Sequence, residues 1–254
     1  MELRKKWYRI ITKLRQIHLS PMTIIAGTFV AIILLGTVLL MLPAASRDGI
    51  SCGFRPALFT ATSATCVTGL VLYDTWTQWS GFGQAVIISL IEIGGLGFMS
   101  LASIFVFALR KKVGLKQRLL MAQALSLDEM QGVVDLQKTV LLGSLAVQGT
   151  GALILFLRFL PDYGPETAAA WGLFHAISAF CNAGFDIFGE FAPGASAGFV
   201  NDDPVVCLTL MALIVVGGLG FFVWEEVIRV QSANCLDVTS KSQMKRQTNG
   251  SYPV

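Results

Sequence analysis

The chain has 254 residues, of which 54% are hydrophobic and only 14% are charged, and its formal net charge is +3. Soluble domains carry nearer a quarter charged residues, so this composition favours a membrane protein and no nucleic-acid partner is expected. The five cysteines (positions 52, 66, 181, 207 and 235) have neither CxxC nor His-paired spacing. Neither a zinc site nor a disulfide framework is therefore predicted.

The amino-terminal part predicts a basic interfacial segment followed by a membrane span. Residues 1–21 contain six Lys/Arg, with Trp7 and Tyr8 among them. Residues 22–42 are uncharged and apolar, and at about 1.5 Å per residue they are long enough to cross roughly 30 Å of hydrocarbon. No small-residue cleavage site follows, so we interpret this stretch as an anchored helix and not as a signal peptide. Pro43 ends the helix.

The next segment predicts a half-helix that enters the membrane and turns back. The apolar stretch 56–64 is too short to cross a bilayer and runs directly into a turn of small residues, 65–69. Irregular backbone at membrane depth requires burial in protein or contact with a wet cavity. A second full span is predicted at 84–109. Residues 22–112 therefore form one helix–pore-loop–helix unit.

The same order of elements then occurs a second time. A polar cytoplasmic linker at 113–136, with a short surface helix, precedes a second unit at 137–230, and a polar cytoplasmic tail occupies 231–254. The second unit is predicted to contain a span, a half-helix, a turn and another span, at 137–160, 167–179, 180–185 and 204–228. The predicted fold is an all-α polytopic membrane protein with four transmembrane helices and two re-entrant half-helices.

Two motif pairs carry this internal repeat. The twelve-residue stretches Leu58–Gly69 and Leu173–Gly184 share seven identical residues without a gap, at an offset of 115. The sequence GGLGF occurs at Gly94–Phe98 and again at Gly217–Phe221, at an offset of 123. The second unit thus has eight additional residues, which we assign to 194–203. The chain is interpreted as two copies of one structural unit.

The charge distribution predicts the orientation in the membrane. Residues 1–21 and 110–138 carry six Lys/Arg each, whereas the loops on the opposite side (43–56, 70–83 and 158–203) carry three Arg and eight Asp/Glu. Because positive charge is retained in the cytoplasm, both termini are predicted to be cytoplasmic and both half-helices to enter from outside.

Such an arrangement suits the passage of a cation. The carboxyl end of each half-helix carries partial negative charge toward the membrane centre, where a cation loses its hydration. The turn that follows can supply backbone carbonyls in place of water. Alternating backbone geometry is needed for successive carbonyls to face the same way, and glycine supplies the positive-φ residue at low cost.

The chain has the motif S-A-x-C-x-x-G at each turn and G-G-L-G-F in each second span. In these motifs it resembles the Trk/Ktr/HKT superfamily of potassium transporters, and the bacterial Trk and Ktr membrane subunits most of all. The resemblance covers about residues 20–230. It implies that Gly69 and Gly184 are selectivity-filter glycines, and that glycine at position 69 favours potassium over sodium. It also implies that the filter carbonyls come from Thr65, Cys66, Val67, Thr68, Phe180, Cys181, Asn182 and Ala183.

The resemblance carries further expectations and one departure. It implies a potassium uptake protein of the bacterial plasma membrane, with K⁺ as substrate, no covalently bound cofactor and a cytoplasmic nucleotide-binding regulatory subunit. Conduction is expected to be either passive or coupled to Na⁺ (symport). Only two of the family's four units are present, so either two chains pair as a homodimer or the second half is missing; we favour truncation. The alternative function is a non-conducting fragment or an assembly subunit. An enzyme is disfavoured, because the spans lack a His/Asp/Glu cluster.

Several other residues are candidates for supporting the pore. For Glu92, the one acid deep in a span, a hydrogen bond to a neighbouring helix or pore loop is favoured over contact with a cation. His175 is expected to be a packing residue in preference to a pH sensor, and Cys66 and Cys181 are expected to be small residues in tight places. The acidic loop 186–203 is interpreted as a solvated outer face. Close helix packing is favoured over a gating hinge for the span glycines Gly94, Gly95, Gly97, Gly217, Gly218 and Gly220.

Overall fold

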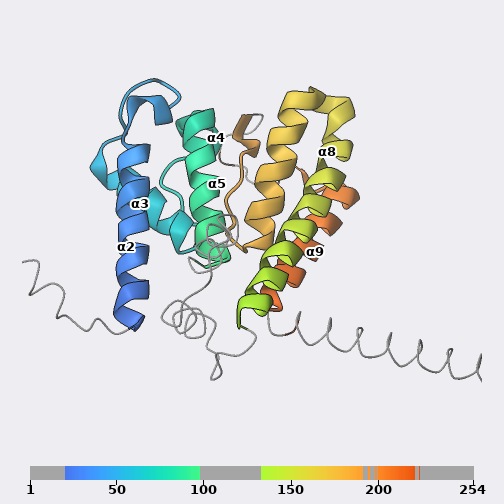
Figure 1. Ribbon diagram of the computed structural model, residues 1–254. Coiled ribbons are helices and arrows are strands. Elements are labelled where there is room, and N and C mark those ends of the chain that lie inside the picture. Colours follow the sequence, from blue (N-terminus) through green and yellow to red (C-terminus); the bar gives the residue numbers. More distant parts are fainter. Residues whose placement is uncertain are drawn as a thin grey trace, which may run out of the picture.

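The structure, a computed structural model, describes residues 21–97, 133–190, 194, 198, 200–220 and 223, and these are organised as helices joined by loops (Figure 1). The all-α prediction is confirmed for this part of the chain. Residues 1–20, residues 113–132 of the predicted linker and the tail 231–254 lie outside it, whereas residues 133–136 of that linker belong to a helix. The elements are α2 (Pro21–Leu40), the 3-10 helix η1 (Pro43–Ala45), α3 (Phe54–Thr65), α4 (Thr75–Gln78), α5 (Gly81–Gly95), α8 (Val133–Phe180), the 3-10 helix η2 (Phe188–Glu190) and α9 (Pro204–Gly218).

The long helix α8 consists of two helical arms joined at a break. Gly164 has φ 76° and ψ 169°, between Pro161 and Pro165. Proline lacks the N–H that a helix interior requires but is favoured in a first turn, so Pro165 suits the start of the second arm. The break falls between the predicted span and the predicted half-helix. Gly53, which precedes α3, has nearly the same geometry, with φ 81° and ψ 169°.

Polar side chains fix where the shorter helices begin. Ser80 accepts a hydrogen bond from the Gly83 N–H at 3.2 Å and caps α5. Asp203 caps α9 by accepting from the Val205 N–H at 3.0 Å, and Pro204 occupies the first turn. Such caps satisfy amide groups that have no partner within the helix.

The helices pack as two groups that meet along α5 and α8. In the first group α3 contacts both α2 and α5, and in the second α8 contacts α9. The first residues of α2 and α8 and the last residues of α5 and α9 lie at the lower end in Figure 1, so each group begins and ends on the same side of the bundle. The core between them contains Ile87, Ile91 and Leu155, each fully buried.

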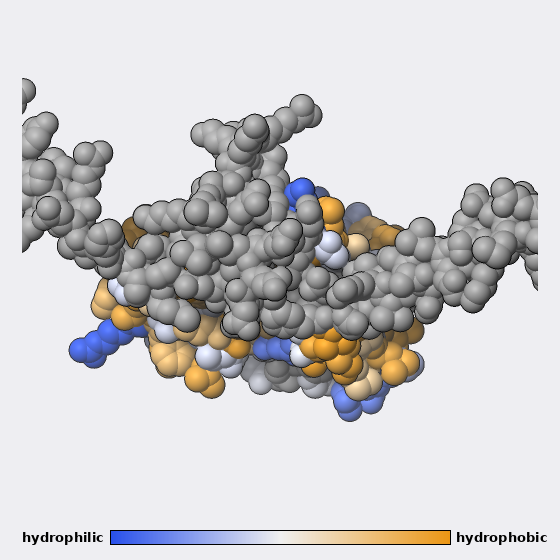
Figure 2. All heavy atoms as spheres, turned by 60° about the horizontal axis from the view of Figure 1, so that its bottom comes forward, coloured by the Kyte–Doolittle hydropathy of each residue, from blue (hydrophilic) through white to orange (hydrophobic). Residues whose placement is uncertain are grey.

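The outside of the bundle is apolar. Large hydrophobic side chains are exposed along the outer helices, and hydrophobic residues are visible in Figure 2 along the rim that the grey atoms leave uncovered. By length and composition, Lys138–Phe180 within α8 could cross a membrane, while the apolar stretches Ile25–Leu40, Gly81–Gly95 and Pro204–Gly218 are shorter. Exposed apolar surface of this extent marks contact with lipid or with another protein. Examples are Val30, Leu34, Leu35, Val38, Leu142, Leu145, Leu153, Leu157, Leu208, Met211 and Val215.

Candidate selectivity filter

The turns after α3 and after α8 have the same backbone conformation. In the first turn Val67 has φ 56° and Gly69 has φ 71°, and in the second Asn182 has φ 59° and Gly184 has φ 71°. Left-handed residues therefore alternate at matching positions of the two sequence motifs. Valine is β-branched and is a rare residue at positive φ, so the first turn contains local backbone strain.

The hydrogen bonds that end the two helices are also the same. Val67 N–H donates to the Ala64 carbonyl at 3.2 Å and Thr68 N–H donates to the Ser63 carbonyl at 3.0 Å. These two bonds define a Schellman motif, in which a left-handed residue closes the helix end. The second turn repeats both bonds 115 positions later, from Asn182 to Ala179 at 3.0 Å and from Ala183 to Ser178 at 2.8 Å.

The carbonyl oxygens of these turns are available for a ligand. Among the described residues, no hydrogen bond is made to a carbonyl oxygen of residues 66–69 or 181–184. Cys66, Thr68, Asn182 and Gly184 are exposed, so carbonyl oxygens of the two adjacent turns can be reached by water or by a cation. Asn182 and Gly184 also line a cavity of about 220 Å³, which Leu210 and Ile214 of α9 close on one side.

The structure brings the two turns together. A Cβ atom added to Gly69 would lie 2.5 Å from the carbonyl oxygen of Ala183, whereas one added to Gly184 would lie 3.7 Å from the Cα atom of Gly69. The two predicted filter glycines thus lie side by side although 115 positions separate them. Only glycine fits at position 69 without displacing the second turn.

Glycines of the second spans pack against the ends of the half-helices. A Cβ on Gly94 would overlap the carbonyl oxygen of Thr65, and one on Gly217 would overlap that of Phe180. This close helix approach was the favoured interpretation of both GGLGF motifs, and these two positions agree with it. Gly95 lies against Cys181 of the other unit, since an added Cβ would be 2.5 Å from its sulfur.

The remaining glycines of the two motifs have other roles. Gly218 has only the Asn182 side chain nearby, 3.6 Å from an added Cβ. Gly97 and Gly220 have φ of 76° and 81°, and no atom of the described residues lies within 4 Å of a Cβ added to either. Because left-handed residues cannot continue a helix, α5 ends at Gly95 and α9 ends at Gly218. The spans predicted at 84–109 and 204–228 are therefore interrupted at these glycines, and the residues beyond them, apart from Val223, lie outside the described part.

Glu92 connects the two units within the bundle. Its Oε2 atom accepts a hydrogen bond from Gln148 Nε2 at 3.1 Å and lies 3.6 Å from the Cys181 sulfur, which donates to it. The predicted hydrogen bond to a neighbouring helix and pore loop is therefore present. Sequence reasoning missed Gln148, although a buried amide in an apolar span is itself a signal that a polar partner lies nearby.

His175 is a packing residue, as predicted. Its Nδ1 atom lies 2.7 Å from the Trp171 carbonyl, which can only accept, so Nδ1 carries the proton. Nε2 accepts from the Ile187 N–H at 3.3 Å, and the ring stacks on Phe188 with centroids 3.8 Å apart. Both ring nitrogens are thus occupied in the neutral form. The histidine therefore connects the half-helix to the segment that follows the second turn.

The two cysteines at the turns differ in their surroundings. Cys181 occupies the tight place that was predicted for both, whereas Cys66 is exposed and the prediction is wrong for it.

Outside the turns, Asp74 connects loops of the two units. Its Oδ1 caps α4 by accepting from Thr77 N–H at 2.9 Å, and its Oδ2 accepts from Gly194 N–H at 3.1 Å. Part of the acidic loop is therefore docked on the first unit.

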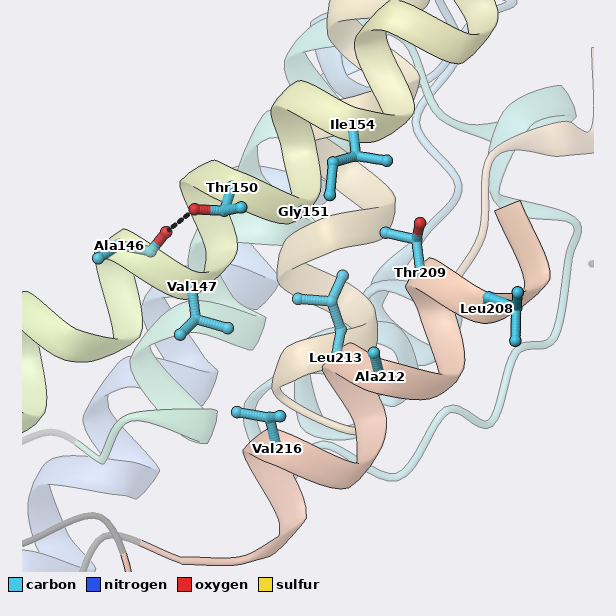
Figure 3. A pocket seen from close by; sticks show the side chains of 10 residues that line it. All are labelled: Ala146, Val147, Thr150, Gly151, Ile154, Leu208, Thr209, Ala212, Leu213 and Val216. Carbon is cyan, nitrogen blue, oxygen red and sulfur yellow. Dashed lines mark hydrogen bonds between the residues drawn. The ribbon is translucent and has the colours of Figure 1, made fainter. Parts of the chain in front are cut away.

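An apolar cavity of about 470 Å³ lies away from the turns, between α8 and α9 (Figure 3). Its two hydroxyl groups are turned to their own helices: Thr150 donates to the Ala146 carbonyl at 2.8 Å and Thr209 to the Val205 carbonyl at 2.7 Å. The lining of the cavity is mainly apolar and includes no residue of 65–69 or 180–184, so the cavity is not part of the candidate filter.

Comparisons with known proteins show the family to which the chain belongs. The chain is 41% identical over 226 residues to the potassium/sodium uptake protein NtpJ of Enterococcus hirae, covering 88% of this chain and 49% of that protein. It is 43% identical over 216 residues to the Ktr system potassium uptake protein B of Bacillus subtilis (85% and 47% covered), and 38% identical over 206 residues to the protein of the same name from Vibrio alginolyticus (81% and 44%). The chain spans about half the length of these relatives. The family model TrkH, described as a cation transport protein, matches residues 6–249. The chain therefore belongs to the TrkH family of cation transport proteins, which are transporters of the membrane and not enzymes.

Proposed function

We propose that this chain supplies two quarters of a potassium-selective pore whose filter is made of backbone carbonyls. The observation that carries the proposal is the meeting of two identical left-handed turns at Gly69 and Ala183–Gly184, with the carbonyl oxygens of residues 66–69 and 181–184 free. Rings of carbonyl oxygens replace the hydration shell of potassium in selective channels. The printed names of the relatives, which refer to potassium or to potassium and sodium uptake, support the choice of ion.

The surroundings of the turns suit a neutral filter. Each turn follows the carboxyl end of a helix, α3 or the second arm of α8, where the aligned peptide dipoles place partial negative charge. A cation at the turns would be stabilised by these dipoles and by the carbonyls together. No covalent step and no bound cofactor are needed for such conduction, and Na⁺ is the proposed coupling ion.

A ring of four quarters needs two further units, and the structure has two complementary open edges. At the contact between the two units, Gly95 packs on Cys181. Among the described residues, no cysteine lies beside the equivalent glycine, Gly218, and the equivalent cysteine, Cys66, is exposed. A second copy of the chain, or further units such as those in the other half of the longer relatives, would fit the Gly218 edge at one end and the Cys66 edge at the other.

The proposed setting is the plasma membrane of a bacterium, with both half-helices entering from outside and both termini in the cytoplasm. The placement of both helix groups with their first and last ends on one side of the bundle supports this topology. The printed name of the Bacillus subtilis relative describes it as part of a Ktr system, and on this basis a regulatory subunit on the cytoplasmic side is proposed as a partner. A nucleotide-binding regulator is the expected kind.

Rubidium uptake tests the proposal. The chain is expressed, at a membrane level verified by immunoblot, in cells that lack their own potassium uptake systems. Uptake above an empty-vector control that is lost in Gly69→Arg is expected if two copies complete one pore. If the chain alone gives no uptake, co-expression with the second half of a relative is expected to restore it. Uptake that survives both Gly69→Arg and Gly184→Arg would refute the filter assignment. If neither the chain alone nor its co-expression with the second half of a relative gives uptake, a non-conducting assembly subunit would be favoured.

A further inference from the structure

Among the described residues inside the bundle, and apart from the loop contact of Asp74, the two units make a polar contact at the carboxyl group of Glu92. Glu92 on α5 accepts from Gln148 on the first arm of α8 and from Cys181 at the end of the second arm. Gln148 is 3% exposed, so its amide has been taken out of solvent to make this contact. The second carboxyl oxygen of Glu92, Oε1, is buried and has no hydrogen-bond partner among the described residues. Burying a polar group opposes folding unless the group is hydrogen-bonded, so the burial of Oε1 without a described partner costs free energy.

The cluster is not a requirement of the repeated unit. At the offset of the GGLGF motifs, Glu92 corresponds to Val215, which is 60% exposed on α9. At the offset of the filter motifs, Gln148 corresponds to Ile33 on α2. Each unit therefore has one polar and one apolar residue at this pair of positions, Ile33 with Glu92 in the first unit and Gln148 with Val215 in the second. The carboxyl–amide pair belongs specifically to the boundary between the units.

The third member of the cluster is the first residue of the second filter turn. Cys181 is held from two directions, by Glu92 through its sulfur and by Gly95, whose added Cβ would lie 2.6 Å from the cysteine Cβ. The carbonyls of residues 181–184 follow directly in the chain. Their position relative to Gly69 is consequently set by α5 of the first unit as well as by the half-helix to which they are attached.

We infer that Glu92 is a positioning residue that fixes the second filter turn against the first unit and thereby sets the preference for potassium over sodium. The inference rests on the proposed function. Groups that bind a ligand must be held within about 0.5 Å by a supporting shell, and a carbonyl filter discriminates between ions by the arrangement and number of its oxygens. Loss of the carboxyl group frees Cys181 and lets the turn adapt to the smaller ion.

The test uses purified chain in detergent and four variants. Glu92→Leu removes the acceptor, and Glu92→Gln keeps an acceptor oxygen of the same reach. Gln148→Leu removes one donor to the carboxyl group, and Val215→Leu is the control at the equivalent position of the other unit. Thermal unfolding is followed without alkali ions and in titrations of KCl and NaCl. These give the baseline stability and the two ion concentrations for half-maximal stabilisation.

The inference predicts a change in ion preference that is separate from stability. Glu92→Leu is expected to reduce the potassium-to-sodium affinity ratio about tenfold, since a hydrogen bond to a charged group is lost. Glu92→Gln is expected to retain most of the ratio, Gln148→Leu to fall between them, and Val215→Leu to match the wild type. A lower baseline melting temperature with an unchanged ratio in Glu92→Leu would overturn the inference, because it would show a purely structural role.

A second measurement keeps the inference separate from the proposed function. In a background where the other four cysteines are serine, the alkylation rate of Cys181 by a maleimide reports how firmly the turn is held. Glu92→Leu is expected to raise this rate at least about fivefold, as expected for loss of a hydrogen bond. A wild-type chain that neither potassium nor sodium stabilises would refute the proposed function instead. In that case the alkylation rates alone would test whether Glu92 holds the second turn. Equal rates in wild type and Glu92→Leu would overturn the inference.

Discussion

The most informative single comparison is between alanine at Gly69 and alanine at Gly184. Both glycines have φ of 71°, so alanine at either position adopts a left-handed conformation that costs about 1–2 kcal/mol. Only at Gly69 would the new Cβ also meet the carbonyl oxygen of Ala183, at 2.5 Å. At Gly184 the nearest atom, the Gly69 Cα, lies at an ordinary contact distance of 3.7 Å. The two variants thus share the backbone strain and differ in the overlap.

Gly184→Ala is expected to lower the free energy of unfolding by the strain alone, which shifts the equilibrium roughly 5- to 30-fold. Gly69→Ala is expected to be worse in two respects, lower stability and weaker ion-dependent stabilisation, because the Ala183 carbonyl must move. Equilibrium unfolding in mixed micelles, with and without KCl, measures both quantities. Equal losses in the two variants, or a larger loss at Gly184, would refute the claim that the turns meet face to face.

Three further predictions concern the supports of the filter. Gly217→Ala should sharply reduce stability and any ion-dependent stabilisation, because its Cβ would overlap the carbonyl oxygen of Phe180. Gly218→Ala should be tolerated, and the expression level and melting temperature of the two variants check this difference. Two substitutions at the left-handed residues should change the free energy of unfolding in opposite directions. Val67→Asn should raise it and Asn182→Val should lower it, by about 1 kcal/mol each in equilibrium unfolding. Asp203→Ala should cost about 1 kcal/mol through loss of the α9 cap, with ion-dependent stabilisation unchanged, and a changed ion response would contradict this.

Much of the fold could be predicted because its cues are local. Apolar stretches between prolines and charged loops indicated where α2, α8 and α9 begin, and Gly164 with its flanking prolines lies where the span and the half-helix were separated. The internal repeat also predicted that Gly69 and Gly184 are equivalent, and their φ values agree. Periodicity and turn chemistry act over a few residues, so the sequence contains these features explicitly.

The features that could not be predicted depend on contacts between distant residues. Nothing in the local sequence pairs Glu92 with Gln148, 56 positions away, or separates a packed Cys181 from an exposed Cys66. Val67 is a poor candidate for a left-handed residue by its own preference, and the surrounding structure overrides that preference. The ends of α5 and α9 were misjudged because the GGLGF motif was taken as a packing surface within a helix, while its third glycine in fact ends the helix.

The contacts of Gly94 and Gly217 have a consequence for how such chains can change length. Gly94 follows Thr65 by 29 positions and Gly217 follows Phe180 by 37, yet both glycines reach the same carbonyl of their own half-helix. Lengthening a flexible connection from 29 to 37 residues costs only about 0.2 kcal/mol in loop-closure entropy. The segment between the end of each half-helix and the second span can thus differ in length while the glycine keeps its contact. An epitope or a fluorophore inserted there would test the proposed outward orientation of this segment.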